Sequence, residues 1–326
     1  MKRTKRILEQ LLEPISVSGY EWELGMADTL QEIVGFPGRR IGNNLVYSFS
    51  GAKSSTLFIS AHMDEVGFIK TKEDKDGSQI LPIGDISFAA IQNAQLIFRA
   101  NNSNVISEII CSGTSFEDAR IQGLSKIPAG SIGTFDKNIS IEGDRIISPG
   151  LDNKVGCAAL VQLVQFLQKS CPSCSIVCCF SAKEEIGTNG VLSAVRSISP
   201  DLVIDIDSAY TSRDSDIPSS WLVTGIGEGP ALQLMGDKFI VSDRYRRIVE
   251  NISKNNNLPL QYEVPDIYSG GTNSSSIQSA GWETIQINIP VAFQHTGKSE
   301  ASISDVETAS DLIIELVTSH TLFDFT

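Results

Sequence analysis

Short apolar runs recur along this chain and end at polar or small residues. Residues 175–180, Ser-Ile-Val-Cys-Cys-Phe, are apolar at almost every position, which is typical of a strand that is buried on both faces of a parallel sheet. We expect further strands at residues 45–49, 56–61, 202–207 and 282–289.

Segments with a helical repeat lie between these runs. The spacing of their apolar residues predicts helices at 5–13, at 20–34, after Asp152, at 242–256 and at the C-terminal end. Buried strands that alternate with such helices predict an α/β fold with a largely parallel sheet. In the second helical segment the apolar residues share one face, which comprises Leu24, Ala27, Leu30, Ile33 and Val34.

The pattern changes between residues 68 and 147, where helical periodicity is scarce. Short runs rich in β-branched residues recur there and are separated by turn signals such as Asp76-Gly77. We therefore expect a small all-β domain at 68–147, inserted into an α/β domain that is formed by 1–67 and 148–326. Because the insert carries no obvious chemistry, we expect it to contact a partner and to shape a cleft.

Composition restricts the kind of partner and the compartment. The 326 residues carry a net charge of −13, which disfavours nucleic acid and anionic membranes because both attract basic surfaces. The basic start of the chain leads into an amphipathic helix instead of the apolar core of a signal peptide, and no run is long enough to cross a bilayer. We expect a cytoplasmic protein without a membrane or nucleic-acid partner.

Four of the six cysteines lie close together, and Cys171 and Cys174 have the spacing of a redox or zinc motif. The sequence has no second Cys or His pair at matching spacing. Cys178 and Cys179 are adjacent in a predicted strand and are expected to face opposite sides of the sheet. We favour buried or unreactive thiols, and a structural zinc is the minor alternative.

Ionisable residues occur where the predicted strands end. Glu184 and Glu185 follow the apolar run described first, and His62 and Asp64 follow another strand. The carboxyl ends of strands are where open α/β sheets build their sites. Asp64 can accept a hydrogen bond from one ring nitrogen of His62 and leave the other nitrogen free for a metal, although a structural histidine is an equal alternative.

Three more candidates occupy similar places. Asp152 lies just before a predicted helix, where it can cap the helix or hold a carboxylate at the edge of a cleft. Asp207 ends an apolar strand, where its charge needs a partner such as a metal ion, and His295 follows another strand. The small residues of a later loop let a ligand approach the backbone. They include Gly270, Gly271 and Thr272.

The candidates form a set of nitrogen and oxygen ligands that suits zinc, cobalt or manganese. The set comprises His62, Asp152, Glu185, Asp207 and His295. Five ligands exceed the needs of one tetrahedral zinc, and they suit two divalent metal ions if one carboxylate bridges the pair. Glu184 is left as a free carboxylate in the position of a general base.

The order and spacing of these motifs resemble the M42 family of metallo-aminopeptidases, which includes glutamyl and tetrahedral aminopeptidases. The resemblance covers nearly the whole chain. The motifs that carry it are His62-Met63-Asp64-Glu65-Val66-Gly67, Leu151-Asp152-Asn153-Lys154-Val155-Gly156, Glu184-Glu185-Ile186-Gly187, Asp207, Gly270-Gly271-Thr272, and Ile289-Pro290 ahead of His295.

The resemblance implies a zinc-peptidase α/β sandwich of three layers with an inserted β domain, assembled as a homo-oligomer of dimers that build a hollow dodecamer. It also implies a role for each candidate. Asp152 would bridge two metals, with His62 and Asp207 on one metal and Glu185 and His295 on the other. Glu184 would be the base, and Asp64 would be the carboxylate partner of His62.

Four positions depart from the family pattern, which has Asp where Asn273 stands, Arg where Ala292 stands and a Leu-Arg pair where Thr188-Asn189 stands. None of them is an expected ligand or base, so they bear on the substrate pocket and the oligomer contacts. We predict metal-dependent hydrolysis of the N-terminal residue of short peptides. The alternatives are another dinuclear zinc hydrolase, such as a deacylase or carboxypeptidase, and a non-catalytic scaffold that kept the fold.

Overall fold

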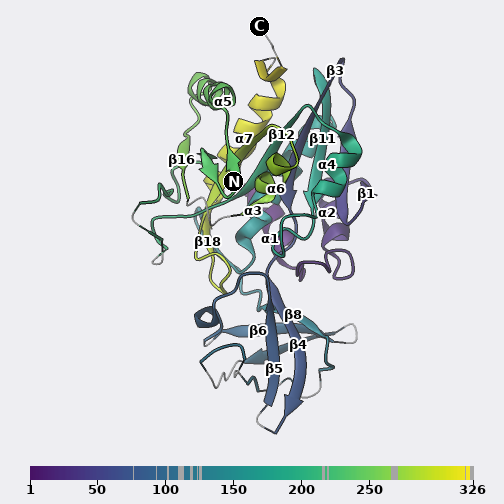
Figure 1. The fold of residues 1–326 in the computed structure, drawn as a ribbon, viewed down its shortest axis with the longest axis vertical. Coiled ribbons are helices and arrows are strands. Elements are labelled where there is room, and N and C mark those ends of the chain that lie inside the picture. The colour runs from purple at the N-terminus through teal and green to yellow at the C-terminus, as the bar shows by residue number, and fades with distance from the viewer. Residues whose placement is uncertain are drawn as a thin grey trace.

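The computed structural model has an α/β body from which a smaller β unit projects (Figure 1). No helix in the described part of the chain is long and apolar enough to cross a membrane. The structure describes residues 1–75, 77–92, 94–100, 103–108, 114–117, 120–122, 124, 127–214, 217–218, 220–265, 271–319 and 321–323.

A mixed sheet of eleven strands forms the centre of the body. Its path runs through β1 (Arg39–Ile41), β2 (Asn44–Phe49), β11 (Cys174–Ser181), β3 (Lys53–His62), β12 (Leu202–Ala209), β17 (Thr284–Ala292), β18 (Glu300–Ser302), β10 (Arg145–Ile147) and β9 (Ser140–Glu142). Two strands lie off this path, β13 (Ala231–Gln233) beside β17 and β16 (Gln261–Glu263) beside β13. The four middle strands, β11, β3, β12 and β17, are parallel.

Helices cover both faces of this sheet, so the body has three layers. One layer contains α1 (Lys2–Leu12), α2 (Met26–Val34), α3 (Leu151–Leu167), α5 (Asp243–Asn255) and α7 (Ile303–Thr318). The opposite layer contains α4 (Leu192–Ile198) and α6 (Asn273–Ser279). Cys178 packs against the first layer and Cys179 against the second, because successive strand residues face opposite sides. The α/β fold expected from the sequence is confirmed.

The helix expected at 20–34 begins later, at Met26. Gly25 has a left-handed backbone with φ of 90°, and Gly35, with φ of 93°, ends the helix. Leu24 therefore lies outside the helix. It packs against a separate buried cluster that comprises Ile15, Val17, Ile97 and Ile132.

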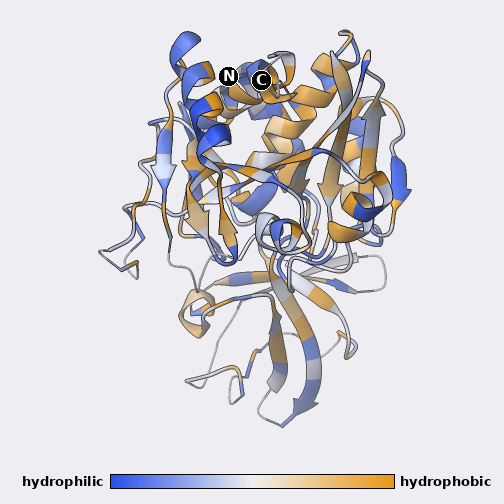
Figure 2. Ribbon diagram, turned by 45° about the horizontal axis from the view of Figure 1, so that its top comes forward, coloured by the Kyte–Doolittle hydropathy of each residue, from blue (hydrophilic) through white to orange (hydrophobic). Residues whose placement is uncertain are grey.

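The projecting unit is a second sheet of five antiparallel strands. In spatial order they are β5 (Gly77–Ile83), β4 (Gly67–Asp74), β8 (Ile132–Phe135), β6 (Gln95–Ala100) and β7 (Ser103–Glu108). Phe68, Phe98 and Phe135 are buried in its own core. Figure 2 shows hydrophobic central strands in the large sheet and a hydrophilic tip on the longest hairpin of the projecting unit.

Two strands within residues 68–147 join the large sheet instead of the small one. Ile146 of β10 lies opposite Ala301 of β18, and β9 pairs with β10. Ile146 is buried in the main core of the body. The apolar pattern of such short runs fits either sheet, and pairing with residues distant in the sequence decides between them.

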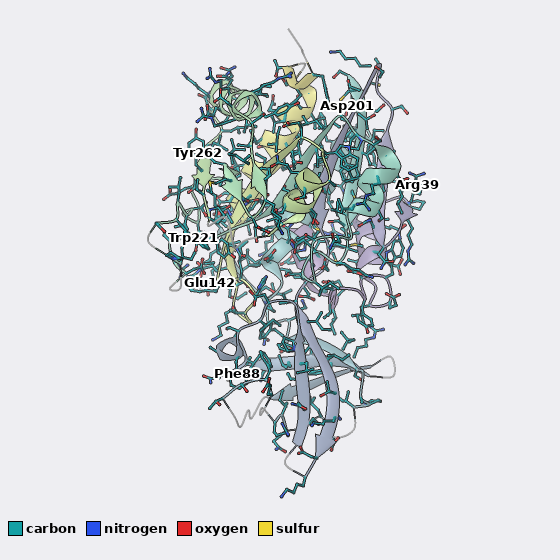
Figure 3. All side chains as sticks on the ribbon, in the orientation of Figure 1. Arg39, Phe88, Glu142, Asp201, Trp221 and Tyr262 are labelled. Carbon is teal, nitrogen blue, oxygen red and sulfur yellow. The ribbon has the colours of Figure 1, made fainter. Side chains whose placement is uncertain are left out.

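The carboxyl ends of the parallel strands face the projecting unit. Asp201, which immediately precedes β12, lies at the opposite end of the body (Figure 3). At the near end, β3 leads through residues 63–66 directly into β4. The remaining short elements are β14 (Met235–Gly236), β15 (Phe239–Ile240) and the 3-10 helices η1 (Phe88–Ile91) and η2 (Thr321–Phe323).

Candidate metal centre

Two candidate residues stand beside each other at the carboxyl edge of the large sheet. His62 is the last residue of β3 and lies opposite Ser181 of β11. Ala61 is paired with Ile206 on the other side, so Asp207 reaches the same edge. Strand pairing thus brings together residues that are 145 positions apart in the sequence.

Asp152 comes from the start of α3, where the backbone is irregular. Asp152 and Asn153 have non-helical φ and ψ and are joined by a cis peptide bond. Asn153 caps the regular helix, because its Oδ1 accepts the N–H of Gly156 at 2.9 Å, while its Nδ2 donates to Ile206 O at 2.7 Å. The capping role considered for Asp152 therefore belongs to Asn153, and the Asp152 carboxylate is directed at the histidines.

The two oxygens of Asp152 face different imidazoles. Oδ1 lies 3.1 Å from His62 Nε2, which is itself 3.3 Å from Asp207 Oδ1. Oδ2 lies 3.4 Å from His295 Nε2, which is 3.2 Å from Glu185 Oε2. The side chains form two groups with the spacing of metal ligands, and Asp152 belongs to both.

His295 lies in a loop after β17 that is held by a neighbouring segment. Its backbone is left-handed, with φ of 57°. Phe293 N donates to Asp214 Oδ1 at 2.6 Å, and Gln294 Nε2 donates to Ala209 O at 3.0 Å. The His295 side chain is 28% exposed, so it borders the opening of the site, whereas His62 is buried.

Asp64 connects the ends of β3 and β11. Its Oδ1 accepts the N–H of Glu184 and its Oδ2 accepts the N–H of Glu185, both at 3.2 Å. Its Oδ1 also lies 3.6 Å from His62 Nδ1. The positions of His62, Glu184 and Glu185 therefore depend on contacts with the buried Asp64 carboxylate.

Lys154 has a structural role at the centre that its place in the motif at residues 151–156 did not reveal. It is fully buried, and its Nζ donates to Met63 O at 2.8 Å and to Asp64 O at 3.3 Å. It therefore holds the turn between β3 and the projecting unit. The available sequence signal is a lysine two residues after a candidate ligand, at the start of an otherwise apolar helix, since lysine is rarely buried without partners.

Buried acids outnumber buried bases at this site. Burial opposes the charge of His62, but the nearby carboxylates, Asp207 above all, outweigh it and raise its pKa well above the ordinary value. Burial also raises the pKa of Glu184 well above its ordinary value, and neighbouring acids add to that effect. The surroundings therefore favour positive charge, which a bound cation would supply.

The donor set fits divalent metal ions. It combines two imidazoles with buried carboxylates, a mixture that suits zinc, cobalt or manganese. Two carboxylate oxygens at this site, Glu184 Oε1 and Glu185 Oε1, are buried and have no hydrogen-bond partner among the described residues. Such atoms are costly unless a ligand or ion completes their contacts.

A cavity of about 430 Å³ opens onto the centre. Gly271 and Thr272 line it, and Gly270 lies outside the described residues. Thr272 also caps α6. The cavity lining includes residues that the sequence analysis passed over, namely Gln233, Lys238, Glu263 and Asn288.

The positions that depart from the family pattern are accommodated in different ways. Asn273 is buried and donates to Ser181 Oγ at 3.0 Å, and Ala292 is buried in β17. Thr188 lines the cavity. Among the described residues, the two groups suited to a metal contain no cysteine. Cys174, Cys178 and Cys179 are buried, as expected, whereas Cys171 is exposed.

Comparison with known proteins gives a consistent result. Residues 114–312 match the model of the M42 glutamyl aminopeptidase family. A protein of Acetivibrio thermocellus that carries a provisional aminopeptidase name is 28% identical, over 95% of this chain and 97% of its own. The lysyl aminopeptidase of Pyrococcus furiosus is 24% identical, over 98% of both chains.

Solved structures share the fold at low sequence identity. A TET aminopeptidase from a marine sediment archaeon of the Thaumarchaeota has a TM-score of 0.89 at 20% identity, covering 98% of this chain and 97% of its own. The structure of PhTET1-12s, described as a dodecamer, has a TM-score of 0.83 at 21% identity, covering 96% of this chain and 98% of its own.

Proposed function

The chain belongs to the M42 glutamyl aminopeptidase family and is therefore a peptide hydrolase of the metal-dependent aminopeptidase class, and we propose that it removes the N-terminal residue of short peptides at a centre of two metal ions. The observation that carries this proposal is the shared position of Asp152. One carboxylate that belongs to both ligand groups is the arrangement expected of a bridge between paired metals.

In this proposal, His62 and Asp207 hold one divalent ion, Glu185 and His295 hold the other, and Asp152 contacts both. Zinc and cobalt are the first choices for the two ions, and manganese is a further one. When bound, such ions supply Lewis-acid activation of the attacking water and the scissile carbonyl.

Glu184 is proposed as the general base. It is buried at the cavity wall, lies outside both ligand groups, and keeps one oxygen without a hydrogen-bond partner among the described residues. It can take the proton of the attacking water and return it to the amine that leaves. Asp64 positions this base, because it accepts the backbone N–H of Glu184.

Assembly into a homo-oligomer is proposed from the relatives. The dodecameric PhTET1-12s shares the fold over almost the full length of both chains. We propose dimers that build a dodecamer, and size-exclusion chromatography with light scattering measures the mass directly. A protein that stays monomeric at micromolar concentration would contradict this part of the proposal.

The proposal is tested on metal-free protein. We expect that zinc or cobalt restores the release of free amino acid from aminoacyl-p-nitroanilides, that a chelator abolishes it, and that saturation requires two ions per chain. An N-acetylated substrate separates the classes, because an aminopeptidase needs the free amine and a deacylase does not. Hydrolysis that persists in the chelator, or equal cleavage of the acetylated substrate, would overturn the proposal.

A further inference from the structure

The cavity extends from the metal centre to a floor of three buried polar side chains, Gln233, Glu263 and Asn288. They come from β13, β16 and β17, at the edge of the sheet beyond β12. None of them belongs to a ligand group of the metal centre. These side chains are therefore available to contact a part of the substrate that does not react.

Strand pairing sets how far this floor lies from the metal centre. Asn288 is the register partner of Asp207, so about 4.8 Å separates their backbones. Asn288 Nδ2 donates to Glu263 Oε2 at 2.6 Å. If the scissile carbonyl lies at the metal centre, the side chain of the N-terminal residue is within reach of the Glu263 carboxylate.

Glu263 is a buried carboxylate without a cationic partner in the described part of the chain. Its Oε1 accepts the N–H of Tyr210 at 2.8 Å, and its Oε2 accepts from Asn288. Both donors are neutral. Burial raises the pKa of Glu263 to about 7, which is the expected response of a carboxylate that lacks a countercharge.

The other charges of the cavity do not compensate for Glu263. Asp85 and Asp237 add two acids to the lining. Lys238 is the one lysine or arginine among the described lining residues, but its Nζ lies 3.4 Å from Asp237 and its side chain is 71% exposed. Away from the metal ligands, the cavity therefore presents a surplus of negative charge.

We infer that this cavity selects substrates whose N-terminal residue carries a basic side chain, lysine or arginine, with the cation seated against Glu263. This inference rests on the proposed function. The four-carbon stem of lysine spans the distance from the metal centre to the floor, and its ammonium supplies the countercharge that Glu263 lacks. An N-terminal glutamate would instead place a second carboxylate beside Glu263, which costs free energy.

The test compares kcat/KM for p-nitroanilides of lysine, arginine, norleucine, glutamine and glutamate with the zinc- or cobalt-loaded protein. Norleucine has the same length as lysine but no charge. We expect the lysyl substrate to exceed the norleucyl substrate by at least about tenfold and the glutamyl substrate to be the poorest. A preference for norleucine, glutamine or glutamate over both basic residues would overturn the inference.

Glu263→Gln tests the assigned residue. It removes the charge at nearly constant volume, so the ratio of lysyl to norleucyl kcat/KM should fall by about tenfold. Glu250→Gln is the matched control, because Glu250 contacts the neighbouring Tyr262 from outside the cavity and should leave the ratio unchanged. An unchanged ratio in Glu263→Gln would remove Glu263 from this role.

Two kinds of failure stay distinguishable. If the loaded protein cleaves no substrate of the panel, the proposed function fails. If it cleaves norleucyl or glutamyl substrates best, the proposed function stands and the side-chain preference is wrong. If Glu263→Gln does not fold, the wild-type lysyl-to-norleucyl ratio still decides the question.

Discussion

The large and small sheets of this molecule both bury apolar side chains, but the large one holds most of the buried ionisable groups among the described residues. Its parallel strands lie between two helical layers and carry His62 and Asp207 at one edge. The small antiparallel sheet buries a core that includes Phe68 and Phe98, and one acid from the turn after β5, Asp85, lines the cavity. The ionisable residues of the site lie where the parallel strands end together, and the antiparallel unit lines part of the cavity beside them.

A buried ion pair connects the two regions. Glu65, in the turn after β3, pairs with Lys137, which follows β8, and also accepts from the backbone of Ser16 at 2.8 Å. Both polypeptide connections between the regions pass close to this pair. The following predictions test how independent the two regions are, from the largest expected effect to the smallest.

The largest effect is expected from Glu184→Gln in the large region. The substitution removes the proposed base and keeps the shape of the side chain, so kcat should fall by about 10²–10⁴-fold. Metal content, measured by mass spectrometry of the dialysed protein, should not change, because Glu184 belongs to neither ligand group. Loss of metal together with activity would assign Glu184 to the ligands instead.

Phe68→Ala should destabilise the small sheet without changing metal binding in the large region. Phe68 is fully buried, and its ring centroid lies 5.4 Å from that of Phe135. Truncation should cost about 3–5 kcal/mol of unfolding free energy in the small sheet. Leu81→Ala is the control, since Leu81 is exposed on the same sheet. Zinc affinity, followed by competition with a chelating dye, should stay close to wild type, and a parallel loss of affinity would show that the regions are coupled.

Lys137→Met should show whether the Glu65–Lys137 ion pair between the two regions contributes to stability. It leaves Glu65 as a buried carboxylate without Lys137, which should lower the unfolding free energy by about 3 kcal/mol in chemical denaturation. Arg246→Met breaks an exposed pair with Asp243 and serves as the control, which should be nearly neutral. If Lys137→Met is equally neutral, the junction does not contribute to the stability of either region.

The smallest effect concerns pH and is specific to the large region. Burial raises the pKa of Glu263 from 4.5 to about 7, so the folded protein holds this proton more tightly than the unfolded chain. The resulting stabilisation is complete below pH 4.5 and is lost as the pH rises through 7, an effect of at most about 3 kcal/mol. In metal-free protein, the unfolding free energy of the wild type minus that of Glu263→Gln should therefore fall between pH 4.5 and pH 8. A constant difference would contradict the raised pKa.

The sequence predicts the parts of this molecule that depend on local pattern. The apolar runs locate the central strands, and the polar residues near their carboxyl ends, together with Asp152 at the start of a helix, make up the five side chains of the two ligand groups. Their proposed roles as ligands await the metal experiments. Asn153 as the helix cap, and the pairing of β10 with β18, depend on contacts with distant residues and leave no periodic signal.

Glu263 illustrates the same limit inside the cavity. In the sequence it is an acid that follows a tyrosine in a short strand, a pattern that also fits an exposed edge. Its burial results from the order β12, β17, β13 and β16 in space, which brings four distant segments together. Sequence spacing does not show which strands are neighbours in space. The metal centre could therefore be predicted from the sequence, but the floor of the cavity could not.

Asp64 sets a fixed spacing within this arrangement. One of its oxygens accepts the N–H of Glu184 and faces the imidazole of His62, and the other accepts the N–H of Glu185. The length of the Asp64 side chain therefore sets the distance between the ends of β3 and β11 at the site. Glutamate at this position would lengthen the side chain by one carbon–carbon bond of about 1.5 Å. The longer residue keeps the same charge, yet it would shift Glu184 and Glu185 relative to His62, so the aspartate length matches this geometry.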